Sequence, residues 1–171
     1  MATETLTVGS MFSGIGLLEQ GLRTGFRRQG IELEVIWQVE IDRACHPVLR
    51  RHFPNAKLYE DVNDERLETL PKTDIIAFGF PCQDISIAGQ GAGLSGERSG
   101  LFFRAWQVSM LVEPKYIIME NVAALLGRGL DQVAATVAES GYNLEWTTLS
   151  AADCGAPHRR KRWWGVAYPR E

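Results

Sequence analysis

The chain has 171 residues, of which 45% are hydrophobic and 23% are charged, and its formal net charge is −3. This length suits one domain with a sizeable core, and we expect a single domain over residues 1–171. No global positive charge indicates a nucleic-acid-binding protein, so any such contact must depend on local positive charge. We find neither an apolar stretch long enough to span a bilayer nor a signal peptide, which predicts an intracellular protein with no membrane contact.

The three cysteines, Cys45, Cys82 and Cys154, are widely spaced and odd in number. This spacing suits neither a disulfide framework nor a zinc site, and we predict no metal. An isolated intracellular cysteine is most often a small buried apolar residue, and this is our interpretation of Cys45 and Cys154.

Cys82 differs from the other two cysteines in its surroundings. It follows an apolar run, residues 74–78, that predicts a buried strand, and Pro81 and Gln83 flank it. A thiol at a strand exit can be presented to a substrate as a nucleophile. The glycine-rich run over residues 89–96 predicts a loop that can change shape beside this thiol.

Apolar runs alternate with amphipathic runs along the whole chain. We expect strands at residues 6–12, 33–39, 58–59, 74–78, 116–119, 144–149 and 163–168. We expect helices at residues 17–28, 42–51, 101–111 and 130–140. This alternation predicts an α/β fold with a doubly wound, mostly parallel seven-stranded sheet.

Polar residues follow several of these strands, and ligands of doubly wound sheets bind at the carboxyl ends of strands. A glycine loop at residues 12–16 follows the first strand, and Glu40 ends the second. An acidic residue there can accept hydrogen bonds from ribose hydroxyls, which indicates an adenosine-containing cofactor. Asp61 can contact an adenine amino group or cap a turn. Glu120, at a buried strand end, can have a raised pKa and act as a general acid, or can cap a helix.

The only dense basic cluster spans residues 158–162 and directly precedes the last expected strand. A charge run is usually a solvated surface. Here the alternation of strand side chains would direct Arg160 and Arg162 to the same side. Guanidinium groups on one side can bind a phosphate or a base carbonyl.

These motifs together resemble those of the DNA (cytosine-C5) methyltransferase family. They occur in the family's order over nearly the entire chain, as the loop Phe12–Gly16, Glu40, Asp61, Pro81-Cys82-Gln83, Glu120-Asn121-Val122 and His158–Arg162. Three positions depart from the family pattern. Ser10 replaces a frequent acidic residue, Leu17 replaces a glycine, and His158 replaces a glutamine.

The resemblance implies a Rossmann-like methyltransferase fold that binds S-adenosylmethionine and releases S-adenosylhomocysteine. The cofactor-binding residues that it implies are Phe12, Ser13, Gly14, Ile15, Gly16, Leu17, Glu40, Ile41, Asp61, Val62, Pro81 and Leu101.

The resemblance also implies DNA (cytosine-5-)-methyltransferase activity on a cytosine flipped out of double-stranded DNA. In this reaction Cys82 would add to C6 of the base, Glu120 would protonate N3, and Arg162, with Arg160 beside it, would hold the carbonyl oxygen at C2. The implied contacts to DNA or substrate come from Gln83, Ser86, Gln90, Arg98 and Asn121.

The family continues past the last residue of this chain with a target-recognition domain and a final helix that completes the cofactor pocket. We therefore expect a catalytic domain that is truncated, or half of a split enzyme whose separate C-terminal chain recognises the target. The alternatives are a transfer-RNA cytosine-C5 methyltransferase and an inactive fragment that binds cofactor or a partner. A bacterial or phage DNA methyltransferase would be cytoplasmic, nucleoid-associated and suited to a restriction-modification system.

Overall fold

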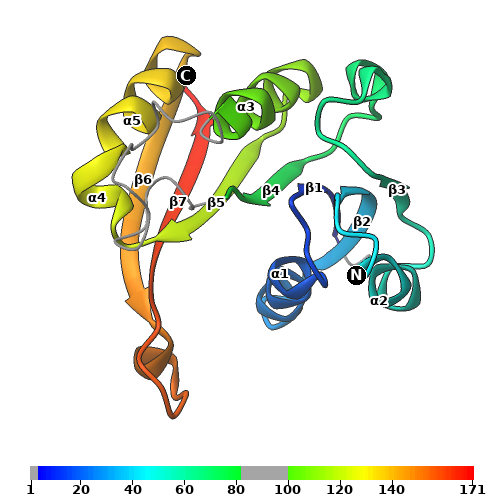
Figure 1. Ribbon diagram of the computed structural model, residues 1–171, viewed down its shortest axis with the longest axis horizontal. Coiled ribbons are helices and arrows are strands. Elements are labelled where there is room, and N and C mark those ends of the chain that lie inside the picture. Colours follow the sequence, from blue (N-terminus) through cyan, green and yellow to red (C-terminus); the bar gives the residue numbers. More distant parts are fainter. Residues whose placement is uncertain (1–3, 82–99) are drawn as a thin grey trace.

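The computed structural model describes residues 4–81 and 100–171, which form one seven-stranded sheet flanked by helices (Figure 1). The strand order is β3-β2-β1-β4-β5-β7-β6. The strands are β1 (Thr5–Met11), β2 (Glu32–Val39), β3 (Lys57–Tyr59), β4 (Ile75–Gly79), β5 (Tyr116–Val122), β6 (Tyr142–Ser150) and β7 (Lys161–Pro169). Strands β1 to β5 pair in parallel, whereas β7 runs antiparallel to both β5 and β6. The predicted doubly wound, mostly parallel α/β fold is confirmed.

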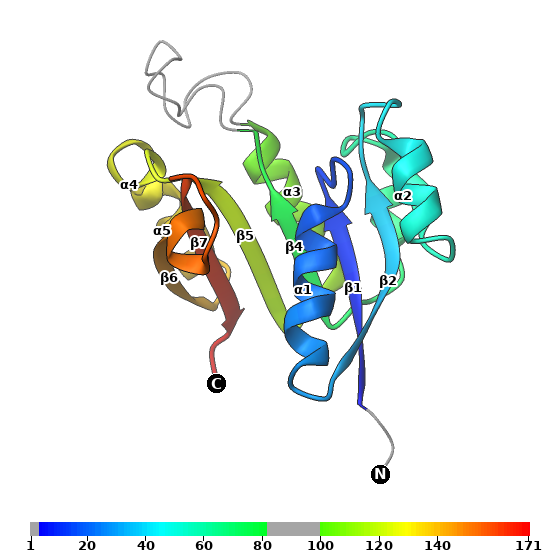
Figure 2. The same cartoon turned by 90° about the horizontal axis from the view of Figure 1, so that it is seen from below.

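Helices cover both faces of the sheet (Figure 2). One face carries α1 (Leu17–Arg27) and α2 (His46–His52), which bury a smaller apolar cluster against β1, β2 and β4. The other face carries η1 (Glu65–Thr69), α3 (Gly100–Val112), α4 (Leu125–Arg128) and α5 (Leu130–Glu139), which bury the larger cluster. A short 3-10 turn, η4 (Ala151–Cys154), joins β6 to β7.

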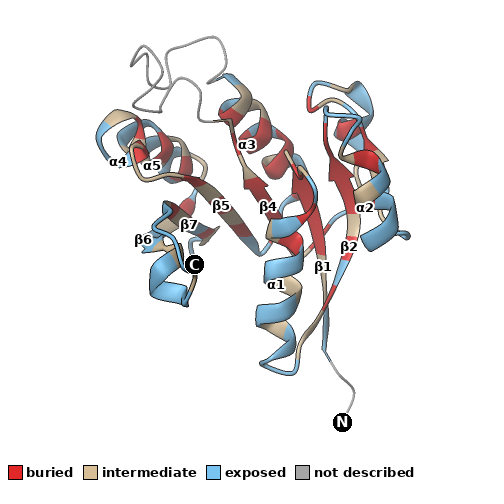
Figure 3. Ribbon diagram, turned by 60° about the horizontal axis from the view of Figure 1, so that its bottom comes forward, coloured by how far each residue is buried: buried red, intermediate tan, exposed pale blue. Residues whose placement is uncertain are grey.

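Strand β4 lies in the middle of the sheet, and burial is concentrated along it and its neighbours (Figure 3). Its residues Ile75 to Phe78 are all fully buried. A strand covered on both faces needs apolar side chains on both, which explains why this run is continuous and not alternating. The burial fixes the chain that leads to Phe80 and Pro81 at the carboxyl edge.

Asp74 ties together the amino ends of β1, β4 and β5. Its Oδ2 accepts hydrogen bonds from the Thr7 amide and the Thr7 hydroxyl, both at 2.8 Å, and its own amide donates to Thr7 Oγ1 at 3.0 Å. Lys115 Nζ lies 2.8 Å from Asp74 Oδ1. The Lys115 side chain, and then the Thr7 amide, lower the pKa of Asp74 from 3.8 to about 2. This edge is therefore held by an ionised carboxylate.

The helix predicted from Asp42 begins instead at His46. The Asp42 carboxylate accepts a hydrogen bond from the Ala44 amide at 2.9 Å and so closes a turn before the helix. Aspartate side chains bond readily to the amide two residues on, and this local bond competes with helix capping. Pro47 lies in the first turn of α2, as expected.

Strand β5 is longer than predicted because it continues through Val122. Glu120 pairs with Trp164, and Asn121 with Trp163, in the antiparallel ladder with β7. Neither residue therefore caps a helix. The sequence pattern also gave no indication of α4. No helix within residues 4–81 and 100–171 is both long and apolar enough to cross a membrane.

Candidate active site

The loop that follows β1 is held in an unusual backbone conformation. Phe12, Gly14 and Gly16 all have positive φ angles, of 55°, 55° and 84°. Glycine adopts this region freely, but Phe12 is strained there, as residues at binding sites often are. A Cβ atom at Gly16 would lie 2.5 Å from the Phe53 ring, so only glycine fits at the start of α1. The sequence of this loop thus encodes its shape.

Glu40 joins this loop to the end of β2. Its carboxylate is 8% exposed and accepts hydrogen bonds from the Gly14 amide at 2.6 Å and the Asp42 amide at 2.8 Å. The Ser13 amide donates to the Val39 carbonyl at 3.2 Å, which adds a second link between the two segments. Each carboxylate oxygen can accept more than one hydrogen bond. Glu40 can therefore still bind a pair of ligand hydroxyls.

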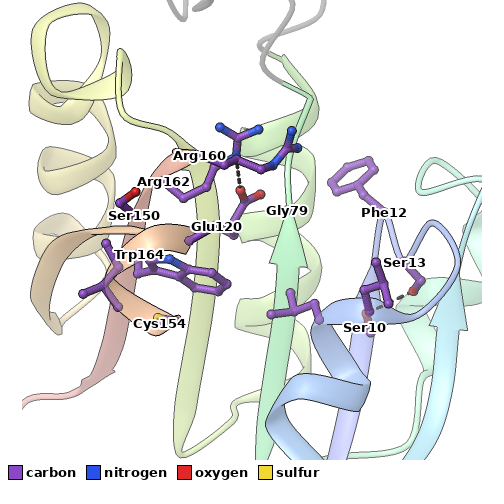
Figure 4. Close-up of a pocket in the computed structure, with 14 residues that line it drawn as sticks. Ser10, Phe12, Ser13, Gly79, Glu120, Ser150, Cys154, Arg160, Arg162 and Trp164 are labelled. Atoms are coloured by element: carbon purple, nitrogen blue, oxygen red, sulfur yellow. Dashed lines mark hydrogen bonds and ion pairs between the residues drawn. The ribbon is translucent and has the colours of Figure 1, made fainter. Parts of the chain in front are cut away.

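A pocket of about 460 Å³ opens at the carboxyl edge of the sheet (Figure 4). It brings together six residues predicted from the sequence, namely Phe12, Ser13, Leu17, Glu120, Arg160 and Arg162. The rest of its lining consists of Ser10, Leu18, Gly79, Leu149, Ser150, Ala151, Cys154 and Trp164. The lining from β1 and α1 is uncharged, whereas its three charged residues come from β5, from β7 and from the residue just before β7.

Glu120 and Arg162 form an ion pair at the charged end of the pocket, with Arg162 Nε 2.8 Å from Glu120 Oε1 (Figure 4). The two side chains are 28% and 21% exposed. Burial raises the pKa of Glu120, while Arg162 and Arg160 oppose that rise. The raised pKa agrees with the prediction from the sequence. The direct ion pair is a contact that the sequence did not indicate, since we expected both groups to bind a base.

Asn121 lies next to Glu120 but is only 1% exposed. Its Nδ2 donates to the Phe80 carbonyl at 3.3 Å, and its Oδ1 accepts from the Val122 amide at 2.7 Å. The Phe80 ring is also buried, 5.1 Å from the Phe102 ring. Asn121 therefore fixes the backbone just before Pro81, which is half-buried. Its predicted contact with substrate stays a prediction.

The other predicted cofactor residues lie at the same edge, outside the 460 Å³ pocket. Oδ1 of Asp61 accepts hydrogen bonds from the Asn63 backbone and side-chain amides, at 2.8 and 3.1 Å, so Asp61 stabilises a turn. Its contact with adenine is untested. Ile15 and Gly16, with Leu17, line a separate pocket of about 210 Å³. Ile41 is 72% exposed. Val62 is buried, and Leu101 packs against the larger core cluster.

Five predicted site residues lie outside the part of the chain that the structure describes. They are Cys82, Gln83, Ser86, Gln90 and Arg98.

The pocket also contains residues that the sequence reasoning missed or misjudged. Cys154 is exposed and lines the pocket, so its prediction as a buried residue was wrong. It lies in η4, at the turn of a long hairpin, where little packs over it. Cys45 is half-buried at the N-cap of α2. The strand alternation that places Arg160 and Arg162 on one side also places Trp164 there, so the sequence could have predicted that Trp164 lines the pocket. Leu149 lines the pocket because it pairs with Arg162 in the ladder between β6 and β7, and no local pattern predicts this pairing.

Comparisons with known proteins agree with this geometry. Residues 6–171 match the family model described as C-5 cytosine-specific DNA methylase. The chain is 35% identical over 165 residues to the type II methyltransferase M2.BsuMI of Bacillus subtilis, covering 92% of this chain and 40% of that protein. It is 34% identical to M.CviJI of Paramecium bursaria Chlorella virus IL3A, with 92% and 41% covered.

Solved structures show the same fold. EhMeth, a methyltransferase of Entamoeba histolytica, has a TM-score of 0.75 at 19% identity, covering 98% of this chain and 54% of that one. A putative DNA modification methyltransferase encoded within an E. coli prophage has a TM-score of 0.70 at 25% identity, with 96% and 47% covered. The chain thus spans about two fifths to one half of the length of these proteins. The match of the family model to nearly all of its residues shows that the chain belongs to the C-5 cytosine-specific DNA methylase family.

Proposed function

We propose that residues 1–171 are the catalytic domain of a DNA (cytosine-5-)-methyltransferase that uses S-adenosylmethionine. The observation that carries this proposal is the pocket, in which Glu120, Arg160 and Arg162 face the loop that follows β1. Membership of the C-5 cytosine-specific DNA methylase family suggests that this arrangement binds a cytosine for methylation. A partly buried acid beside two guanidinium groups suits the polar edge of that base.

The loop that follows β1 lines the other end of the pocket, and Glu40 lies beside this loop, outside the pocket lining; both fit the cofactor. Glu40 keeps acceptor capacity for the ribose hydroxyls, and Phe12 and Leu17 offer apolar surface to the rest of the nucleoside. Ile41, Asp61, Val62, Pro81 and Leu101 would complete its surroundings, with adenine near Asp61. S-adenosylmethionine supplies the methyl group when bound.

The protein's own groups activate the base. The thiolate of Cys82 donates an electron pair to C6 of cytosine, and the electron density displaced from the C5–C6 bond moves toward C5 and N3. Glu120 donates its proton to N3 as this charge develops. Arg162 holds the carbonyl oxygen at C2, and Arg160 adds positive charge nearby. Once C5 carries the methyl group, its proton passes to solvent, the C5–C6 double bond re-forms and the Cys82 thiolate leaves. N3 returns its proton to Glu120, which restores the free enzyme.

A base that enters the pocket also changes the state of Glu120. It displaces water from the carboxyl group and draws Arg162 toward its carbonyl oxygen. Both changes favour the protonated acid, since burial already raises the pKa of Glu120 and Arg162 opposes that rise. The ion pair therefore favours the ionised form of Glu120 before the base binds, and entry of the base favours the protonated form that donates to N3.

We further propose double-stranded DNA as the substrate, with Gln83, Ser86, Gln90, Arg98 and Asn121 as contacts to it. Since the chain spans about 40% of M2.BsuMI, a further region or a separate chain would recognise the target sequence. Residence at the nucleoid and a role in restriction-modification would follow from such a substrate. The relatives above are named as type II methyltransferases and the matching family model is one of DNA methylases, which gives the transfer-RNA alternative no support.

The test is covalent trapping on duplex DNA that contains 5-fluorocytosine, with S-adenosylmethionine present. Fluorine at C5 cannot leave as a proton does, so the Cys82 adduct should accumulate and appear by denaturing electrophoresis. Cys82→Ser should abolish the adduct, and Cys154→Ser, the matched control at the pocket wall, should retain it. An adduct that persists in Cys82→Ser contradicts the assignment. The assay should be run with the chain alone and with the C-terminal part of M2.BsuMI added, because the proposal assigns target recognition to a region outside these residues.

A further inference from the structure

Trp164 of β7 is the direct neighbour of Glu120 in the sheet. The two residues are partners in the antiparallel ladder between β5 and β7, and both line the pocket of about 460 Å³ (Figure 4). Side chains of opposed residues in such a ladder point to the same face of the sheet, with their Cβ atoms about 4.5 to 5.5 Å apart. The indole therefore lies against the acid on which the proposed reaction depends.

The neighbour of Glu120 on the other side has no side chain. Gly79 of β4 is the register partner of Glu120 in the parallel ladder between β4 and β5, and it also lines the pocket. A Cβ atom at Gly79 would lie 3.0 Å from Glu120 Oε2, so the carboxyl group leans over this glycine. Across the sheet, the acid thus has open pocket on its β4 side and an aromatic ring on its β7 side.

Packing of the core does not require an indole at position 164. The Trp164 side chain is half-buried, and neither apolar cluster formed by the described residues includes it. Its neighbour Trp163 points to the opposite face of the sheet and is fully buried in the larger cluster. The bulk of Trp164 is therefore directed at the pocket and at Glu120, and not at the core.

The charged groups around Glu120 act against its neutral form. Burial raises the pKa of Glu120, whereas Arg162 and Arg160 lower it. The Cys154 thiol of η4 is the remaining titratable group in the described lining, because β1, α1, β4 and β6 contribute none. Apolar surface removes water from a carboxyl group without adding charge, and so favours the protonated acid. Among the ladder partners of Glu120, Trp164 is the one that supplies such surface.

We propose that Trp164 is a positioning residue whose indole shields the β7 side of the Glu120 carboxyl group from water and holds that group over Gly79. This inference rests on the proposed function, in which Glu120 donates a proton to the base. Shielding on one side helps the acid to keep its proton, and the lean over Gly79 directs it to the open part of the pocket. Trp164 acts through Glu120 and not on the reacting atoms.

The experiment measures the pH dependence of adduct formation on duplex DNA that contains 5-fluorocytosine, for the wild type and three variants of β7. Trp164→Thr removes the ring and keeps a residue that suits a strand, and Trp164→Phe keeps an aromatic ring. The matched control is Val166→Thr, since Val166 lies on the same face of β7 but pairs with Ile118, outside the pocket lining.

The two substitutions of Trp164 should separate shielding from folding. Without the indole, water reaches Glu120, which then loses its proton at lower pH. The alkaline limb for Trp164→Thr should therefore move to lower pH, and the rate on that limb should fall roughly threefold or more relative to the wild type. Trp164→Phe and Val166→Thr should keep the limb of the wild type. A general loss of structure would lower the rate at every pH and leave the limb in place.

A second measurement follows Glu120 without any reaction. An isotopic label at the side-chain carboxyl carbon of glutamate gives titration curves by NMR, and Glu120→Gln identifies the signal of Glu120. This curve should move to lower pH in Trp164→Thr and stay in place in Trp164→Phe and Val166→Thr. A curve that is the same in Trp164→Thr and the wild type overturns the proposal, as does an equal movement in Val166→Thr.

The two measurements also separate this proposal from the proposed function. A wild type that forms no adduct refutes the proposed function, while the titration of Glu120 still decides whether Trp164 shields it. If Trp164→Thr does not fold, Trp164→Val opens the same space and gives the same two readouts.

Discussion

The tie between Asp74 and Thr7 predicts a defined acid sensitivity of the fold. The pKa of Asp74 is lowered from 3.8 to about 2, chiefly by the Lys115 side chain and then by the Thr7 amide. At about 1.36 kcal/mol per pH unit, this difference corresponds to about 2.4 kcal/mol. Lys115 is 68% exposed, so water screens its share, and we expect about 1 to 2 kcal/mol. Because the folded-state pKa is the lower one, this stability is present above pH 4 and is lost as the pH falls toward 2.

The assay is urea unfolding followed by circular dichroism between pH 7 and pH 2.5, for the wild type and Asp74→Asn. The difference in unfolding free energy between the two proteins isolates Asp74, because every other titrating group is common to both. It should be constant from pH 7 to about pH 4.5 and should then shrink, with about two thirds of the expected 1 to 2 kcal/mol lost by pH 2.5. Lys115→Met should cost less than about 1 kcal/mol, as expected of an exposed partner. A difference that does not vary with pH would refute the reasoning.

Three further predictions concern the site and the core. Asn121→Ala removes the hydrogen-bond donor to the Phe80 carbonyl and should lower the free energy of unfolding in urea by about 1 to 2 kcal/mol. It should also slow adduct formation by Cys82, and an unchanged trapping rate would contradict the positioning role of Asn121. Gly9→Ala would place a methyl group 2.0 Å from a buried indole of β2 and should cost at least about 3 kcal/mol, which a thermal melt would show. Arg162→Gln removes a group that lowers the pKa of Glu120, so Glu120 should stay protonated to higher pH. The alkaline limb of the pH profile for adduct formation should therefore move to higher pH, and a limb that stays in place would count against the ion pair.

The fold could be predicted from the sequence because its elements have strong local signals. The continuous apolar run of β4 and the glycines after β1 each allow few conformations. The errors fall where tertiary contacts decide. Asp42 is a residue type that caps helices, but its side chain closes a separate turn before α2. Strand β5 continues through Glu120 because it pairs with β7. Such a pairing depends on residues more than 40 positions away, which no local pattern contains.

The sequence predicted the individual residues of the candidate site better than it predicted the contacts between them. Glu120 and Arg162 were identified separately, but their ion pair follows from the register of two antiparallel strands. Cys154 lines the pocket because η4, which joins β6 to β7, contributes to the lining together with the residues next to it.

The two ends of the pocket differ in how far they are assembled before a ligand arrives. Beside the end proposed for the cofactor, the Gly14 amide already donates to Glu40 and the Ser13 amide to the Val39 carbonyl, so binding there need not order the backbone. At the end proposed for the base, Arg162 would have to exchange its bond to Glu120 for one to the substrate. A preorganised first site and a second site that changes partners would favour binding of the cofactor before the base. Under the proposed function, the cost of breaking the ion pair falls on the step that also unstacks the cytosine, so the charged end would be the point at which a correct base is distinguished from a wrong one.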